Sequence, residues 1–279
     1  MSTLTVKQLS NFDGFPKAAE LIEISGAHNL EALDRANFNQ LLQVAHDSDR
    51  LMEPGASWEV TFASLRRASS KHESNDRIRE SLRRLRRTEV VVRYISTKDG
   101  RPRKLETSLL TFTDTAEDDH SAATIVFSIP DPLRLILARS NRWGRIRCEV
   151  SYAMKSKYAI ALYEMVALRL NMDRCVETMP LETFRDKLGV PPNAYERSDN
   201  FLQFVIRPAL LEVNRLSDVN VRIELERRHA RAPAHAVTFS WRRKQGDAFR
   251  ATLKELQRPK AGRRKRLKAQ DPAQPELEL

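Results

Sequence analysis

The chain has 279 residues, of which 41% are hydrophobic and 30% are charged, and its formal net charge is +11. This length accommodates two domains that each bury a core, and the composition is that of a soluble globular protein. Apolar runs such as AIALYEMVAL (159–168) are shorter than the roughly 18 residues of a membrane-spanning helix. The N-terminus lacks the basic start and apolar stretch of a signal peptide, so a cytoplasmic location is expected. The positive charge favours polyanionic partners, above all nucleic acid.

The first half of the chain combines helical and strand patterns. Residues 1–28 are interrupted by Gly14, Pro16 and Gly26 and are expected to form an N-terminal extension. From residue 30 to 46, apolar side chains recur at helical spacing among good helix formers, so this segment is predicted to be a helix. Further predicted elements are a strand at 58–62, helices at 62–70 and 75–87, and strands at 90–96, 108–113 and 123–129.

The second half repeats this order of elements. The sequence predicts helices at 157–170, 181–188 and 199–216, and strands at 175–179, 219–228 and 235–243. Gly189 is expected to end the second of these helices, and Pro208 to kink the third because its ring removes a backbone donor. Two copies of helix, strand, helix, turn, helix and hairpin predict an α+β fold of two tandem winged-helix domains, at residues 29–148 and 149–245.

Residues 246–279 form a polar C-terminal tail in this interpretation. The stretch begins with a helical pattern, carries seven basic residues between 258 and 268, and ends in the acidic PELEL. Since it has almost no apolar side chains to bury, we expect it to be disordered. Its positive charge is suited to contact phosphates.

Sequence motifs for catalysis are few. The chain has no GxxxxGK[ST] phosphate loop and no His-x-His pair of a rolling-circle nickase. The run EDDH at 117–120 is the one constellation that a metal-dependent polymerase or nuclease could use, but its place between strands favours a solvated loop. Cys148 and Cys175 lack metal-ligand spacing and are expected to be buried thiols. We therefore expect no enzyme activity, no metal and no cofactor.

Three blocks of the second half resemble a known family. They are KSKYAIALYEMVALRL (155–170), PLETFRDKLGVP (180–191) and NAYERSDNFLQFVIRPALLEVNRLSDVNV (193–221). Their order and spacing closely resemble the second winged-helix domain of iteron-binding plasmid replication initiators (Rep proteins). The first half is similar to the first domain of that family more loosely, through LDRANFNQLLQVA (33–45), DRIRESLRRLRRTEVVV (76–92), IPDPLRLIL (129–137) and RIRCEV (145–150). The resemblance covers about residues 30–241.

This resemblance implies an initiator that binds double-stranded DNA at tandem direct repeats of a plasmid origin. It also implies opening of the adjacent AT-rich duplex, recruitment of the host helicase and host initiator proteins, and repression of its own gene by a homodimer. The ATP chemistry would then come from host factors. Two other interpretations remain open from the residues alone. One is a tandem winged-helix transcriptional regulator without origin function, and the other is a nonspecific nucleic-acid binder that acts through the basic tail.

The second helix of a helix-turn-helix places residues at base edges of the major groove. In SDNFLQFVIRP, the side chains of Phe201, Val205 and Ala209 fit a buried stripe. Amide side chains suit adenine, and arginine suits guanine. The predicted base-contacting residues are Arg197, Asn200, Gln203 and Arg207. The alternative for Arg197 and Asn200 is capping and solvation of the helix. Similar initiators often have basic residues where this chain has Gln203 and Phe204.

RIRESLRRLRR (77–87) is the corresponding helix of the first domain. Ile78, Leu82 and Leu85 are spaced to face the core, and Ser74 or Asn75 is the expected N-cap. Arg77 and Arg84 are expected to pair with Glu73, Glu80 or neighbouring strands. The residues predicted to lie on the outer flank are Arg79, Arg83, Arg86 and Arg87. We expect these four arginines to contact phosphates while the second domain reads more of the base sequence.

Overall fold

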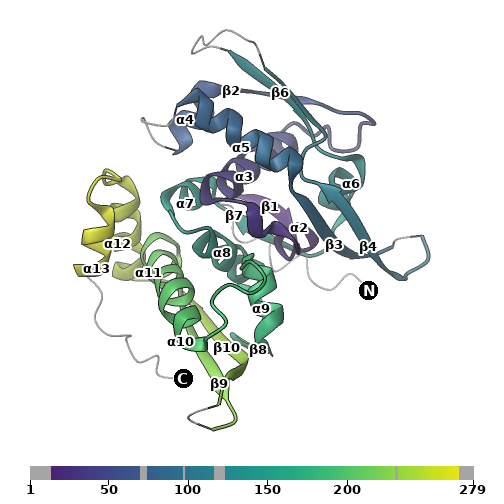
Figure 1. Ribbon diagram of the computed structural model, residues 1–279. Coiled ribbons are helices and arrows are strands. Elements are labelled where there is room, and N and C mark those ends of the chain that lie inside the picture. Colours follow the sequence, from purple (N-terminus) through teal and green to yellow (C-terminus); the bar gives the residue numbers. More distant parts are fainter. Residues whose placement is uncertain (1–13, 70–73, 97, 116–122, 230–231, 270–279) are drawn as a thin grey trace.

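The structure is a computed structural model that describes residues 14–69, 74–96, 98–115, 123–229 and 232–269. Its elements form two groups that meet along the central helices α3 (Ala32–Asp47) and α8 (Lys157–Arg169), as Figure 1 shows. No helix in these ranges is long and apolar enough to cross a membrane.

The first group contains most of the elements that the sequence predicts. Besides α3 it comprises β1 (Phe15–Ala18), α2 (Ala19–Ile22), η1 (Ala27–Asn29), β2 (Trp58–Thr61), α4 (Phe62–Ser69), α5 (Asn75–Arg87), β3 (Glu89–Ile95), β4 (Pro102–Ser108), β5 (Phe112–Thr115), β6 (Thr124–Ser128), α6 (Asp131–Arg139), β7 (Trp143–Ile146) and α7 (Cys148–Ala153). The strand predicted at 108–113 was misplaced. Leu109 N–H donates to Leu85 O and Thr111 N–H donates to Ser128 O, because the chain crosses here from the β3–β4 pair to the β2–β6–β5 sheet.

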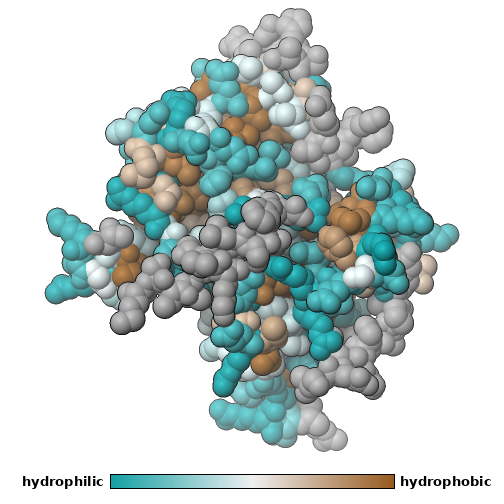
Figure 2. All heavy atoms as spheres, turned by 180° about the vertical axis from the view of Figure 1, so that it is seen from behind, coloured by the Kyte–Doolittle hydropathy of each residue, from teal (hydrophilic) through white to brown (hydrophobic). Residues whose placement is uncertain are grey.

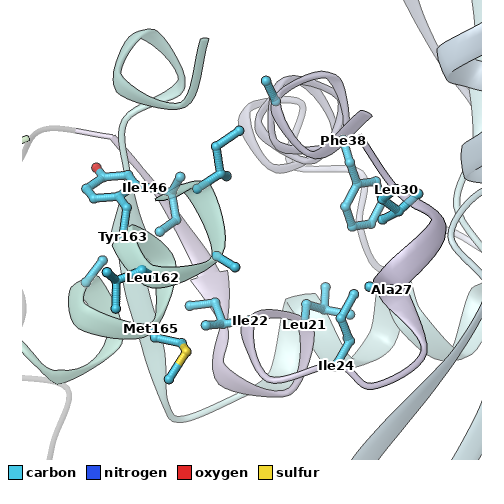
Figure 3. Close-up of a cluster of buried hydrophobic side chains, with 14 of the residues drawn as sticks. Leu21, Ile22, Ile24, Ala27, Leu30, Phe38, Ile146, Leu162, Tyr163 and Met165 are labelled. Carbon is cyan, nitrogen blue, oxygen red and sulfur yellow. The ribbon is translucent and has the colours of Figure 1, made fainter. Parts of the chain in front are cut away.

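Residues 15–28 belong to the core instead of forming an extension. Strand β1 pairs antiparallel with β7, with Phe15 opposite Ile146. Ile22 of α2 is buried, and its side chain faces α8, where Met165 lies (Figure 3). The apolar side chains of this segment are therefore needed to close the core where the two groups meet.

The second group follows the predicted order closely. Besides α8 it comprises β8 (Val176–Pro180), α9 (Leu181–Leu188), α10 (Ser198–Phe201), η2 (Leu202–Ile206), α11 (Arg207–Leu216), β9 (Val219–Arg227), β10 (Ala234–Arg243), α12 (Gly246–Gln257) and α13 (Arg263–Ala269). The sheet has the order β8–β10–β9. Gly189 ends α9 as predicted, with a φ of 74°. A Cβ atom at Gly189 would lie 2.6 Å from Arg35 Nη2 of α3, so a larger residue would displace the Arg35 side chain.

A buried polar network joins the two groups. Lys17 Nζ donates to Glu164 Oε2 and to Asn39 Oδ1, both at 2.9 Å. Asn39 Nδ2 donates to Glu164 Oε1 at 2.7 Å and to Ser151 Oγ at 3.2 Å. Burial lowers the pKa of Lys17, and the neighbouring Glu164 carboxylate offsets part of that shift. The hydrophobic core is continuous across these residues, and the boundary between residues 148 and 149 stays a prediction.

Residues 246–269 differ from the expected disordered tail, because they form α12 and α13, which pack against α11 and α7. The Arg263 side chain is buried and donates to Ala153 O of α7 at 3.3 Å. Leu267, one turn later, is 3% exposed and belongs to the core. Arg263 and Leu267, together with the ion pair between Arg266 and Glu255 of α12, attach the basic helix to the domain. Residues 270–279 lie outside the described ranges.

The helix at 198–216 runs through Pro208 with one wide turn, so that α10, η2 and α11 are consecutive parts of it. Within η2 the hydrogen bonds span five residues, and Arg207 N–H donates to Leu202 O. Proline cannot donate to the carbonyl of Phe204 four residues before it and would crowd that carbonyl in a regular α-helix. The wide turn accommodates the ring, and we call this whole helix the 198–216 helix.

Candidate DNA-binding surface

The 198–216 helix follows α9 as the second helix of a helix-turn-helix. Its buried stripe is confirmed, because Phe201, Val205 and Ala209 are fully buried. The opposite face is in solvent. All four residues predicted to face DNA are exposed: Arg197, Asn200, Gln203 and Arg207. Arg197 occupies the N-cap position, yet its side chain forms no capping hydrogen bond. Capping therefore does not account for Arg197.

The turn before this helix is held by Arg185 of α9. Its guanidinium donates to Tyr195 O at 3.0 Å and to Ala194 O, and lies over the Phe201 ring at 5.0 Å from the ring centroid. Asn193 and Tyr195 both have positive φ, of 61° and 55°. A left-handed backbone costs a non-glycine residue about 1 kcal/mol or more, and the bonds from Arg185 stabilise it here.

Phe204 is a further residue on the outer face, and the sequence did not single it out as a contact. Its side chain is 54% exposed, and its ring centroid lies 6.2 Å from that of Tyr195. Asn200, Gln203 and Phe204 are spaced three and four residues apart, so they share one face of the helix. This spacing is the sequence signal that could have identified Phe204 as a residue of the outer face. Elsewhere the surface seen in Figure 2 is mainly hydrophilic, with hydrophobic side chains in scattered patches.

The hairpin of β9 and β10 is fastened to the start of the 198–216 helix. Arg227 Nη2 of β9 forms an ion pair with Asp199 Oδ1 at 2.9 Å. The backbone N–H of Ala234 in β10 donates to Ser198 Oγ at 3.0 Å. The hairpin therefore occupies the place of a wing beside the exposed face of the helix.

Helix α5 is divided into a core face and a charged face. Ile78, Leu82 and Leu85 are buried as predicted, and Ser74 is the N-cap, its Oγ accepting from Arg77 N–H at 3.2 Å. The three arginines of the C-terminal half of the helix that lie in solvent are Arg83, Arg86 and Arg87. Arg83 pairs with Glu80 on the same helix, and Arg86 Nη1 donates to Thr113 Oγ1 at 3.3 Å.

Two arginines of α5 have structural contacts. Arg84 binds the carboxylate of Asp34 in α3 and also pairs with Glu80 at 3.7 Å, which confirms its predicted pairing with Glu80. Arg79 is the least exposed of the four arginines predicted to lie on the outer flank, at 24% side-chain exposure. It lies over the Phe62 ring, 5.0 Å from the ring centroid. The prediction of an outer-flank position thus holds for three of the four.

Two family models match this chain. The model described as Initiator Replication protein, WH1 matches residues 16–167, and the model described as Initiator Rep protein, WH2 matches residues 180–241. The chain belongs to the Rep replication initiator family. The two winged-helix domains expected from the order of elements are thereby confirmed.

One solved structure agrees with this assignment at the level of the fold. The Pi initiator protein, solved in complex with iteron DNA, has a TM-score of 0.63 and 11% sequence identity with this Rep initiator. The match covers 83% of this chain and 97% of that chain. Domains 2 and 3 of RctB match with a TM-score of 0.47 and 13% identity, over 77% of this chain and 83% of that chain. No curated protein sequence matches.

In this Rep initiator the two exposed faces lie in different domains. Helix α5 packs on α3, α3 packs on α8, and α8 packs on α11, so two central helices separate α5 from the 198–216 helix (Figure 1). The predicted contact residues therefore form two surfaces instead of one cluster. We call the exposed face with Arg83, Arg86 and Arg87 the arginine face, and the exposed face of the 198–216 helix the reading face.

The cysteines differ from each other. Cys148 is buried, and burial raises the pKa of its thiol. Cys175 is exposed, contrary to the expectation, because it follows an exposed loop and precedes the edge strand β8. Within the described ranges, no group of three His, Cys, Asp or Glu side chains could hold a metal ion. The EDDH run at 117–120 lies outside these ranges.

Proposed function

We propose that this chain initiates plasmid replication by binding tandem direct repeats at the plasmid origin with both winged-helix domains. The observation that supports this most strongly is the reading face. Asn200, Gln203 and Arg207 are exposed along the first half of the second helix of a helix-turn-helix, and their side chains can form paired hydrogen bonds with adenine or guanine.

The two domains have different roles in this proposal. The arginine face contacts phosphates of one part of the repeat, because arginine guanidinium groups in solvent attract phosphate without regard to base sequence. The reading face supplies most of the base contacts. The net charge of +11 assists both contacts by attracting the duplex.

The proposal includes further steps, which membership of the Rep initiator family supports. Binding at several repeats bends the DNA and opens the adjacent AT-rich duplex, with the deformation energy supplied by the contacts. Host initiator proteins and the host helicase then enter the opened duplex. A homodimer of the chain represses its own gene at an inverted repeat.

A footprint of the purified full-length chain on the DNA that flanks its own gene tests the proposal. We expect protection of several tandem repeats beside an AT-rich tract, with repeat spacing close to whole helical turns of about 10.5 base pairs. Permanganate reactivity of thymines in the AT-rich tract reports duplex opening. The salt concentration is stated, since affinity for DNA depends steeply on it.

A matched pair of variants makes the footprint specific to the reading face. Combined replacement of Asn200, Gln203 and Arg207 by alanine is expected to remove protection. Arg250→Ala is the control, because it removes an exposed arginine of α12 that is not part of the reading face. This variant is expected to keep the protection intact. Protection of a single inverted repeat without any tandem repeat would favour the transcriptional regulator, and no protected site would contradict both functions.

A further inference from the structure

Phe204 is a large apolar side chain in the middle of a polar surface. It is 54% exposed, and its neighbours on the reading face are the exposed Asn200, Gln203 and Arg207. At 54% exposure, Phe204 leaves much of its ring available for contact with a ligand. Its position at the centre of the proposed base-reading residues points to contact with the bases themselves.

Tyr195 holds the Phe204 ring in place. The two ring planes are tilted by 30° with their centroids 6.2 Å apart, within the separation at which aromatic pairs attract each other. Tyr195 is itself fixed, because Arg185 binds its carbonyl oxygen at 3.0 Å and its backbone has a φ of 55°. Burial, and next to it the neighbouring Tyr195, raise the pKa of Tyr158 in α8 to about 12. The aromatic pair is therefore presented by a rigid turn.

The chemistry of the major groove offers one apolar feature that an aromatic ring can recognise. Thymine has a C5-methyl group there, and the other three bases have no methyl group at their groove edges. Asn200, Gln203 and Arg207 can bond to those atoms but gain little from a methyl group. Phe204 supplies the complementary apolar surface.

We propose that Phe204, supported by Tyr195, contacts a thymine methyl group in the bound repeat and makes that A·T pair part of the recognised sequence. This inference rests on the proposed function, since it requires the reading face to lie in the major groove. Phe204 is then a specificity-determining residue, and Tyr195 is a positioning residue.

Replacement of thymine by deoxyuridine tests the contact, because this removes the methyl group and leaves all hydrogen-bonding groups of the base pair. The probe is a duplex of one repeat selected by the full-length chain from a randomised library. Each thymine in it is replaced in turn, and the dissociation constant is measured by fluorescence anisotropy at fixed salt. We expect one or two positions at which deoxyuridine weakens binding about four-fold, the change that corresponds to burial of one methyl group.

Three variants connect the effect to the aromatic pair. Phe204→Ala is expected to bind the thymine and deoxyuridine duplexes equally at the sensitive position. Tyr195→Asn removes the supporting ring while keeping a residue that tolerates positive φ, and is expected to reduce the discrimination partly. Met172→Ala changes a similarly exposed apolar side chain outside the reading face and is expected to retain the wild-type discrimination. Thermal unfolding of each variant verifies that it is folded.

The outcomes separate this inference from the proposed function. Failure to select any repeat would overturn both. Selection of a repeat whose binding is insensitive to deoxyuridine at every position would overturn the inference and leave the function standing. Methyl sensitivity that persists unchanged in Phe204→Ala would also overturn it, because another residue would then contact the methyl group.

Discussion

Arg84 Nε donates to Asp34 Oδ2 across 2.8 Å, and this bond joins α5 to α3. The carboxylate of Asp34 is fully buried and also accepts from the backbone N–H of Glu31 at 2.7 Å. The hydrogen bond that Arg84 donates to Asp34 raises the pKa of Arg84, so the guanidinium stays charged. A structural arginine thus lies within a run of arginines that otherwise looks uniform in sequence.

Arg84→Ala is predicted to lower the free energy of unfolding by about 2–3 kcal/mol, because it leaves the buried Asp34 carboxylate without its charged partner. Arg83→Ala is the matched control on the same helix. Its exposed pair with Glu80 contributes at most about 0.5 kcal/mol. Urea denaturation of both variants measures the difference, and equal destabilisation would contradict this division of roles.

Combined replacement of Arg83 and Arg86 by alanine is predicted to flatten the salt dependence of repeat binding. Each lost phosphate contact lowers the slope of log K against log salt concentration by about 0.9, so two contacts account for about 1.8. The ratio of affinities for the repeat and a scrambled duplex is expected to stay nearly unchanged. An unchanged slope would show that these arginines do not contact phosphate.

Arg207→Ala is predicted to weaken binding by about 1–3 kcal/mol and to relax the preference at particular base pairs, as expected for an arginine that reads guanine. The measurement compares the wild type and the variant on a set of singly substituted repeats. If the variant loses the same affinity for every sequence, Arg207 contacts phosphate instead of a base edge.

Truncation after Gln257 is predicted to destabilise the second domain by about 3 kcal/mol. It removes the buried Leu267 side chain and leaves the buried Glu255 without Arg263 and Arg266. Truncation after Ala269 is the control and is expected to leave the midpoint of thermal unfolding unchanged. Equal midpoints for the two truncated chains would show that α13 contributes no stability.

The charge of α13 is tested without removing the helix. Replacing the exposed Arg264, Lys265 and Lys268 by glutamine is expected to keep the preference for the repeat over a scrambled duplex. Loss of all DNA binding in this variant would instead support a nonspecific binder that acts through the basic segment.

The ion pairs of Glu23 are predicted to stabilise the contact between the two domains by an amount that depends on pH. Its carboxylate bonds to Lys187 Nζ at 2.8 Å and to Arg169 Nη2 at 2.7 Å. Burial alone would raise the pKa of Glu23, but these two cations outweigh burial and hold it below the ordinary value of 4.5. The stabilisation is therefore present above that value and is lost as pH falls through the lower pKa of the folded state.

The measurement for Glu23 is the difference in unfolding free energy between the wild type and Glu23→Gln. We expect a constant difference near neutral pH that shrinks as the pH falls below 4.5. Because the two chains share all other acidic groups, their common acid unfolding cancels. A difference that does not change with pH would show that Glu23 stabilises the interface without its charge.

Much of the fold could be predicted because residue patterns over a few positions determine many of its helices and strands. The stripe of Phe201, Val205 and Ala209 and the stop at Gly189 depend on spacing and backbone geometry within a few residues. The strand predicted at 108–113 was misplaced because the bonds of that segment go to Leu85 and Ser128, which no local pattern reveals. Arg263 was assigned to a solvated tail for a related reason, since its partners include the carbonyl of Ala153, 110 residues away.

The sequence by itself determined most helices and strands of the two winged-helix domains and the exposure of Asn200, Gln203 and Arg207, because helical periodicity separates a buried from a solvated side. Only the tertiary structure decided which arginines of α5 are structural, how residues 15–28 and 246–269 join the core, and where Phe204 meets Tyr195. Each of these depends on groups that are distant in sequence. Charge and hydropathy alone cannot distinguish an arginine that faces a buried carboxylate from one that faces water.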